Sequence, residues 1–226
     1  MTEQREIGWD VPEYDTSGAP WPEYYAALGR FVQMYGSAEE RLHSVLKGII
    51  FDLTSTEGTK FNLEIIGAIT GSMRFAGLRD HFKRIFRVSN YDQPYVVEFD
   101  YVLNQLGDIH SFRDRIVHHG AAAFSATEFV TSNVETVREG DQEELIIFTP
   151  EILLDMASDL RAARVFLAEL NDIFLTMETS GPTWDRWITS VRPKWRFKSS
   201  NLRREGPKHW TKPPMRSKKP KRSDEP

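Results

Sequence analysis

Residues 106 to 120 of this chain read LGDIHSFRDRIVHHG. Apolar residues recur every three or four positions from Val96 up to this stretch, and that spacing predicts an amphipathic helix. Gly120 and three following alanines end the helical pattern, and an alternating pattern begins after them. The stretch therefore closes a long helix, and its last turns carry a group of polar side chains: Arg113, Asp114, His118 and His119.

This position at a helix end has chemical consequences. Unpaired carbonyls give the last turn partial negative charge, which favours a protonated histidine. A histidine near neutrality can transfer a proton, and the planar donors of an arginine fit a phosphate. Arg113 also falls on the helical stripe that should face a core, where an unpaired guanidinium is unfavourable. The pattern predicts a site for a phosphodiester.

The order of these residues resembles a known motif. Arg113, the polar Asp114, three further residues and His118, followed by His-Gly, are similar to the R-polar-x-x-x-H motif of the HEPN superfamily, whose commonest version has Asn at the second position. The resemblance covers about residues 22 to 180. It implies an all-α, up-down bundle of four to five helices and a homodimer in which two copies of the motif face each other.

The resemblance also implies an activity. HEPN ribonucleases cleave RNA without a metal or other cofactor: the 2′-hydroxyl attacks its own phosphate, and by this analogy His118 transfers the proton and Arg113 stabilises the developing charge. Asp114 would hold one of them in place. The setting would be a toxin or phage-defence effector, with an antitoxin or regulatory protein as a further partner. Four residues are second-rank site candidates: His119, His110, Arg115 and Glu40.

A second interpretation needs no catalysis. The same helical domain can be an inactive HEPN-like module that binds RNA, a nucleotide or a partner protein, with Asp114 marking the departure from the active motif. In that case Arg113 and Asp114 form an ion pair and His118 caps a helix end. Short motifs arise by chance often enough to keep this alternative open.

Composition narrows the class of protein. The chain has 226 residues and no cysteine, which excludes disulfides and thiolate metal sites. Its six histidines include no convincing ligand set beyond one adjacent pair, so no metal site is expected. No apolar run approaches the roughly 20 residues of a membrane span. The acidic N-terminal sequence lacks the regions of a signal peptide. We therefore expect a cytoplasmic protein that does not enter a membrane.

Periodicity predicts the other elements. We expect helices over about 22–53, 61–88, 94–119 and 150–177, and a short helix after Gly181. Gly67, Gly71 and Gly77 weaken the second helix and indicate close packing. Alternation over about 122–149 predicts a two-stranded β-hairpin between the third and fourth long helices.

The two ends differ from the body. Residues 1–22 are rich in proline and carry two tryptophans, so we expect an arm that lies across the body or meets a partner. From Arg192 onward, 13 Lys and Arg stand against 3 Asp and Glu, so the last 35 residues carry +10 and the first 191 carry −14. Residues 181–226 are predicted to form the short helix and a disordered basic tail. The tail is either inert or an RNA-binding arm with four candidate contacts: Lys194, Trp195, Arg196 and Lys198.

Overall fold

The computed structural model describes residues 21–54, 67, 70–71, 73–88, 93–132, 144–174 and 181–205. The predicted N-terminal arm before Trp21 and the chain after Glu205 lie outside the described residues. The prediction of a mostly helical protein is confirmed, with a small antiparallel sheet added. The α-helices in the described part are α1 (Trp21–Thr54), α3 (Phe75–Val88), α4 (Gln93–His119), α5 (Pro150–Phe174) and α6 (Gly181–Val191).

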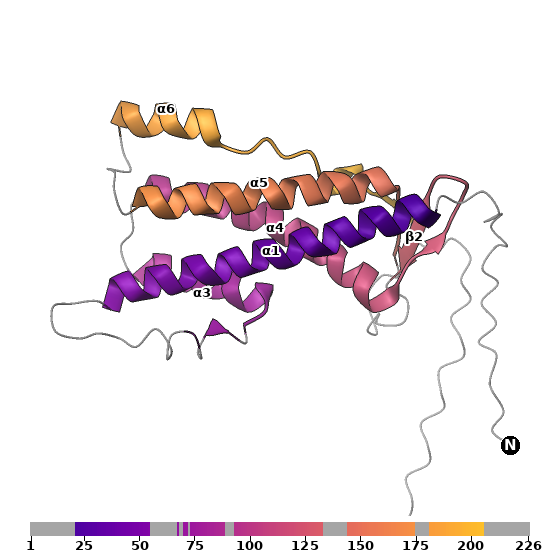
Figure 1. The fold of residues 1–226 in the computed structure, drawn as a ribbon, viewed down its shortest axis with the longest axis horizontal. Helices are drawn as coiled ribbons and strands as arrows, with labels where there is room; N and C mark the ends of the chain where they lie inside the picture. The colour runs from indigo at the N-terminus through magenta and orange to yellow at the C-terminus, as the bar shows by residue number, and fades with distance from the viewer. Residues whose placement is uncertain are drawn as a thin grey trace, which may run out of the picture.

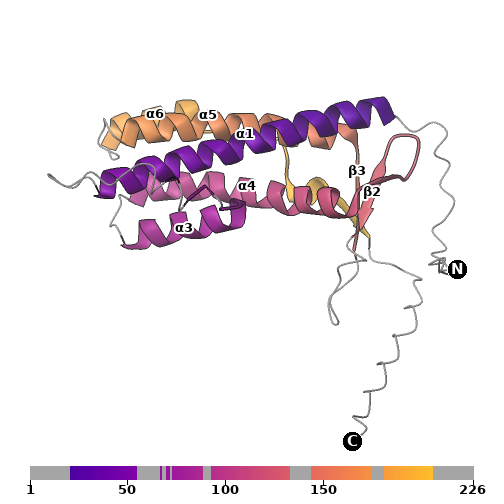
Figure 2. The same cartoon turned by 60° about the horizontal axis from the view of Figure 1, so that its bottom comes forward.

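The three long helices lie side by side (Figure 1). α1 packs along α5, α4 lies against α5, and α3 covers the side formed by α1 and α4. α6 lies over α5 on the opposite side from α3, where Phe166 stacks on Trp187 with ring centroids 6.1 Å apart (Figures 1 and 2). Apolar residues at helical spacing, such as Leu42 and Leu46 of α1 and Leu160 of α5, are fully buried between the helices. No helix in the described ranges is long and apolar enough to cross a membrane.

The second predicted helix is interrupted. Instead of running continuously over 61–88, the chain is non-helical at Met73 and Arg74, and α3 begins at Phe75. The Phe75 N–H donates a hydrogen bond to Glu39 Oε1 of α1 at 3.0 Å, so a side chain from another helix caps the start of α3. Most of residues 61–72 lie outside the described ranges.

A four-stranded antiparallel sheet closes one end of the helices (Figure 2). Its order is β1 (Ala122–Ala123), β2 (Phe129–Ser132), β3 (Leu145–Phe148) and β4 (Arg203–Glu205). β2 and β3 pair antiparallel, with Phe129 opposite Phe148. The predicted two-stranded hairpin was therefore incomplete, because a strand from the C-terminal segment pairs with β3 and a two-residue strand pairs with β2.

Aromatic side chains fasten this sheet to the helices. Phe129 stacks on Tyr24 of α1 at 4.3 Å, and Phe148 meets Phe112 of α4 edge-on at 5.1 Å. All four rings are buried. Burying a ring of this size stabilises the fold by roughly 1.5–3 kcal/mol, so the sheet fixes the end of α4, which carries the predicted site.

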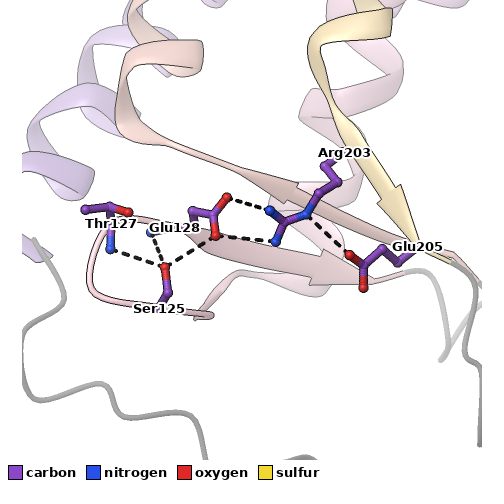
Figure 3. Close-up of polar contacts among 5 residues, drawn as sticks. All are labelled: Ser125, Thr127, Glu128, Arg203 and Glu205. Carbon is purple, nitrogen blue, oxygen red and sulfur yellow. Dashed lines mark hydrogen bonds and ion pairs between the residues drawn. The ribbon is translucent and has the colours of Figure 1, made fainter.

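β4 is also held by charges (Figure 3). Arg203 donates to both carboxylate oxygens of Glu128 at 3.0 and 3.3 Å, and its Nε lies 3.3 Å from Glu205. Ser125 closes the turn before β2 by accepting the N–H groups of Thr127 and Glu128 through its Oγ. The two-pronged arginine contact ties the C-terminal strand to the turn that precedes β2.

Residues 192–198, which we call the strap, connect α6 to the sheet and were predicted to belong to a disordered tail. That prediction is wrong for residues 192–205. Phe197 is only 1% exposed, and the N–H groups of Arg196 and Phe197 both donate to the carboxylate of Asp159 on α5 at 2.9 Å. Gln105 of α4 donates to Asp159 and to the Phe197 carbonyl, each at 2.9 Å.

The first residues of the strap lie on α4. Arg192 pairs with the buried Glu98 at 3.0 Å and lies 4.0 Å from the ring centroid of Tyr101. The Tyr101 hydroxyl donates to the Pro193 carbonyl at 2.8 Å. A basic composition suggested disorder, but each of these contacts supplies the burial or hydrogen bonding that an ordered segment requires.

Candidate functional site

The end of α4 is set by a glycine. Gly120 has φ +68°, and its N–H donates to the Ile116 carbonyl at 2.9 Å, the usual arrangement of a helix that ends in a left-handed residue. Glycine adopts this conformation without steric cost. His118 and His119 consequently occupy the last turn of α4, as the sequence predicted.

One turn earlier, four side chains from α1 and α4 form a connected polar cluster. The Tyr35 hydroxyl lies 2.6 Å from His110 Nδ1, and His110 Nε2 lies 3.3 Å from Asp114 Oδ2. Arg113 Nη1 donates to Asp114 Oδ1 at 2.9 Å. We call these four residues the Tyr35–Arg113 cluster. It includes Arg113 and Asp114, the first two residues of the motif, and His110, a second-rank candidate.

Burial sets the protonation of this cluster. Burial lowers the pKa of His110, against the opposing effect of Asp114, so the imidazole is neutral at pH 7. A neutral ring that donates from Nε2 to Asp114 accepts at Nδ1, and the Tyr35 hydroxyl is therefore the donor to it. Burial also raises the pKa of Tyr35, which keeps this hydroxyl protonated. His110 thus orients Asp114 and has no ring nitrogen left for a substrate.

Arg113 remains accessible despite these contacts. Its side chain is 33% exposed and that of Asp114 is 40% exposed, and the guanidinium lies 5.2 Å from the centroid of the Tyr35 ring. An unpaired guanidinium on a stripe that faces the core would be unfavourable. Here the Asp114 carboxylate balances the charge of Arg113, and the Tyr35 ring covers one side of its guanidinium. Part of the Arg113 side chain remains open to solvent.

His118 is not part of this cluster. It is exposed, and it makes no hydrogen bond or ion pair within the described part of the chain. Five residues along an α-helix correspond to about 140° around the axis, so Arg113 and His118 point to different sides of α4. The adjacent His119 is half-buried.

Two of the second-rank candidates are elsewhere. Arg115 forms an ion pair with Glu144 at 2.6 Å, and Glu144 also binds Arg204 of β4 at 2.9 Å, so Arg115 joins α4 to the sheet. Glu40 is exposed on α1, and its side chain makes no hydrogen bond or ion pair with the cluster in the described part of the chain, whereas its neighbour Glu39 caps α3.

The predicted RNA contacts of the C-terminal segment divide by orientation. Lys194, Arg196 and Lys198 are exposed along the strap, while Trp195 is half-buried and stacks on Tyr101 at 5.2 Å. One face of the indole is thus already covered. The three cations are free to meet a polyanion, but the predicted base-stacking role of Trp195 would use only its other face.

Sequence reasoning assigned no site role to Tyr35 and Glu39. Both lie on α1, one turn apart, and reach the cluster only because α1 packs beside α3 and α4. Tyr35 falls on the apolar stripe of its helix, where tyrosine is unremarkable. The available signal in the sequence is that a tyrosine hydroxyl at a core position needs a hydrogen-bond partner.

Among the described residues, no group of three or more His, Asp and Glu side chains converges as metal ligands would. Comparison of the chain with protein-family models, with curated proteins and with solved structures finds no match. The HEPN resemblance therefore depends on the motif and its helical context alone.

Proposed function

We propose that this protein is a metal-independent endoribonuclease of the HEPN type that works as a homodimer. Arg113 binds the scissile phosphate, Asp114 positions Arg113, and His118 transfers the proton. The observation that carries the proposal is the separation of the motif on α4: Arg113 and His118 both reach solvent but do not meet within one protomer.

A second copy of the chain would complete the site. If the ends of two α4 helices face each other, His118 of one protomer can approach the phosphate held by the partner's Arg113. This arrangement is the one that the HEPN resemblance implies, and closed two-fold assemblies are the commonest homo-oligomers. It also gives the exposed and unpartnered His118 a reason to remain free.

The chemistry then proceeds as follows. His118 takes the proton of the RNA 2′-hydroxyl, the 2′-oxygen bonds to phosphorus, and the bond from phosphorus to the 5′-oxygen breaks as that oxygen regains a proton. The Arg113 guanidinium stabilises the charge that develops on the phosphoryl oxygens. The products are a 2′,3′-cyclic phosphate and a 5′-hydroxyl. A toxin or phage-defence role, restrained by an antitoxin or regulatory protein, fits such an activity.

A second candidate function is a non-catalytic module of the same fold that binds RNA, a nucleotide or a protein. The closed Arg113–Asp114 ion pair favours it, because a neutralised guanidinium has weaker attraction for phosphate.

Cleavage of RNA in the presence of EDTA tests the two candidates. We expect the wild type to cleave and to leave 2′,3′-cyclic phosphate ends, and Arg113→Ala and His118→Ala to be inactive with unchanged helical circular dichroism. Arg186→Ala, which removes an exposed arginine from α6, is a matched control and should remain active. No cleavage by the wild type on total RNA from several sources would favour the binding module.

A further inference from the structure

A second arginine lies beside the Tyr35–Arg113 cluster, on α3. Phe75 at the start of α3 packs against His110 with ring centroids 4.9 Å apart. Arg79 lies one turn further along α3, and a Cβ placed on Gly107 would come within 3.3 Å of its Nη1. The guanidinium therefore rests on the bare backbone of α4 at Gly107, one turn before His110.

This placement puts two arginines on either side of His110. Along α4, Gly107, His110 and Asp114 follow one another on the same side of the helix, at intervals of one turn. Seven residues separate Gly107 from Asp114, which corresponds to about 10 Å along the axis. The cluster itself carries no net charge, because Asp114 balances Arg113 and His110 is neutral.

Arg79 has no counter-charge in the described part of the chain. Its Nε is buried without a hydrogen-bond acceptor, and the side chain makes no ion pair there. Other arginines near the sheet and the strap have carboxylate partners, namely Arg115, Arg192, Arg203 and Arg204. A guanidinium without a counter-charge is unfavourable, and an outside anion that binds its terminal nitrogens offsets that cost.

The neighbouring charges point to a polyanion. Residues 74–88 carry five Lys and Arg against Asp80 alone, and none of those cations forms an ion pair within the described residues. Lys83 and Arg87 continue the helical row that starts at Arg79, and both are exposed. A row of unpaired cations leading to a phosphodiester site matches the backbone of single-stranded RNA.

We infer that Arg79 binds a phosphate of the RNA adjacent to the one held by Arg113, and that Gly107 keeps the space which this contact needs. The inference rests on the proposed ribonuclease function. It assigns to α3 the part of the site that positions the substrate strand, while Arg113 and His118 act on the reacting atoms.

The test measures the affinity of the full-length protein for a single-stranded RNA oligonucleotide in which the 2′-hydroxyls are blocked by methylation, at several salt concentrations. Losing one phosphate contact lowers the slope of log affinity against log salt by about 0.7 and the affinity at 0.1 M salt by about fivefold. We expect both changes for Arg79→Gln and neither for Arg186→Gln, which removes an exposed arginine from α6 on the opposite side.

Gly107→Ala is the second variant, because it leaves every charge in place. Its added methyl group meets Arg79 Nη1, so RNA affinity should fall while the thermal midpoint stays the same or rises, as alanine favours a helix. If the wild type cleaves RNA but Arg79→Gln binds with wild-type affinity and slope, the inference about Arg79 is wrong and the ribonuclease proposal stands. A wild type that neither binds nor cleaves RNA overturns both.

Discussion

Asp159 is predicted to be the residue whose loss most weakens the C-terminal half of the fold. It is 1% exposed and accepts hydrogen bonds from Gln105 Nε2 and from the N–H groups of Arg196 and Phe197. Alanine at this position removes all three bonds. The Gln105 amide and the Phe197 N–H would then stay buried with a missing acceptor, or the strap would detach.

The size of the effect follows from these groups. A buried donor left without an acceptor costs about 1–3 kcal/mol, and two such donors are affected. Alanine also removes the cost of burying a carboxylate, a burial that raises the pKa of Asp159, and this gain offsets part of the loss. We expect Asp159→Ala to lower the free energy of unfolding by about 3 kcal/mol, out of a total of about 5–15 kcal/mol for a domain of this size.

Urea unfolding followed by circular dichroism measures this free energy, and hydrogen exchange of the strap amides shows whether the loss is local. Asp159→Asn should fall between wild type and alanine, because its oxygen still accepts one N–H while its amide group faces a second donor. Asp155→Ala, one turn away and without a hydrogen bond in the described chain, is the control and should change stability by less than about 0.5 kcal/mol. An Asp159→Ala protein as stable as the control, with protected strap amides, would refute the argument.

Three further predictions concern the elements around the site. Because the pKa of His110 in the folded protein lies below its ordinary value of 6.5, the free energy of unfolding should fall as the pH drops from 6.5 through that lowered pKa. In urea titrations His110→Gln should lose less stability over the same pH interval, and an equal loss would contradict this prediction. Glu39→Ala should destabilise the protein by about 1 kcal/mol by removing the cap on Phe75, and Glu40→Ala, its exposed neighbour, should not. Gly120→Ala should cost about 1–2 kcal/mol because alanine resists φ +68°, and a neutral result in thermal unfolding would argue against this end of α4.

The parts of the fold that sequence predicted are those set by local periodicity. The apolar spacing in α1, α4 and α5 extends over many turns, and Gly120 punctuates α4, so these helices could be placed to within a few residues. The start of α3 could not, because its cap is Glu39, 36 residues earlier in the chain. Gly71 gave only a weak sign of the break.

The strap and β4 were missed for a different reason. Their composition is basic, and the carboxylates that hold them are distant in sequence: Asp159 and Glu98 hold the strap, and Glu128 and Glu144 hold β4. An alternation was nevertheless present: Pro193 and Phe197 are buried, while the cations between them are exposed. In residues 193–197 this alternation, and not the net charge, agrees with the order that the structure shows.

For the candidate site, sequence could predict the neighbours on one helix but not the contacts from others. The pairing of Arg113 with Asp114 follows from adjacency, and His110 is one turn from Asp114. The bond from Tyr35 to His110 joins residues 75 positions apart, and only tertiary packing creates it. The five-residue spacing already implied that Arg113 and His118 point to different sides of a helix. In the structure α4 continues to His119, so this geometry applies to both residues.

The central claim is that the ribonuclease site is shared between two protomers, and mixing inactive subunits tests it most directly. Arg113→Ala and His118→Ala proteins are each inactive in this account, but a mixed dimer holds one site with both residues intact. After subunit exchange at equal concentrations, about half of the dimers are mixed, and we predict about one quarter of wild-type cleavage activity. If the mixture remains as inactive as either variant, although native mass spectrometry detects mixed dimers and the wild type cleaves, the two residues act within one protomer and the shared site is wrong.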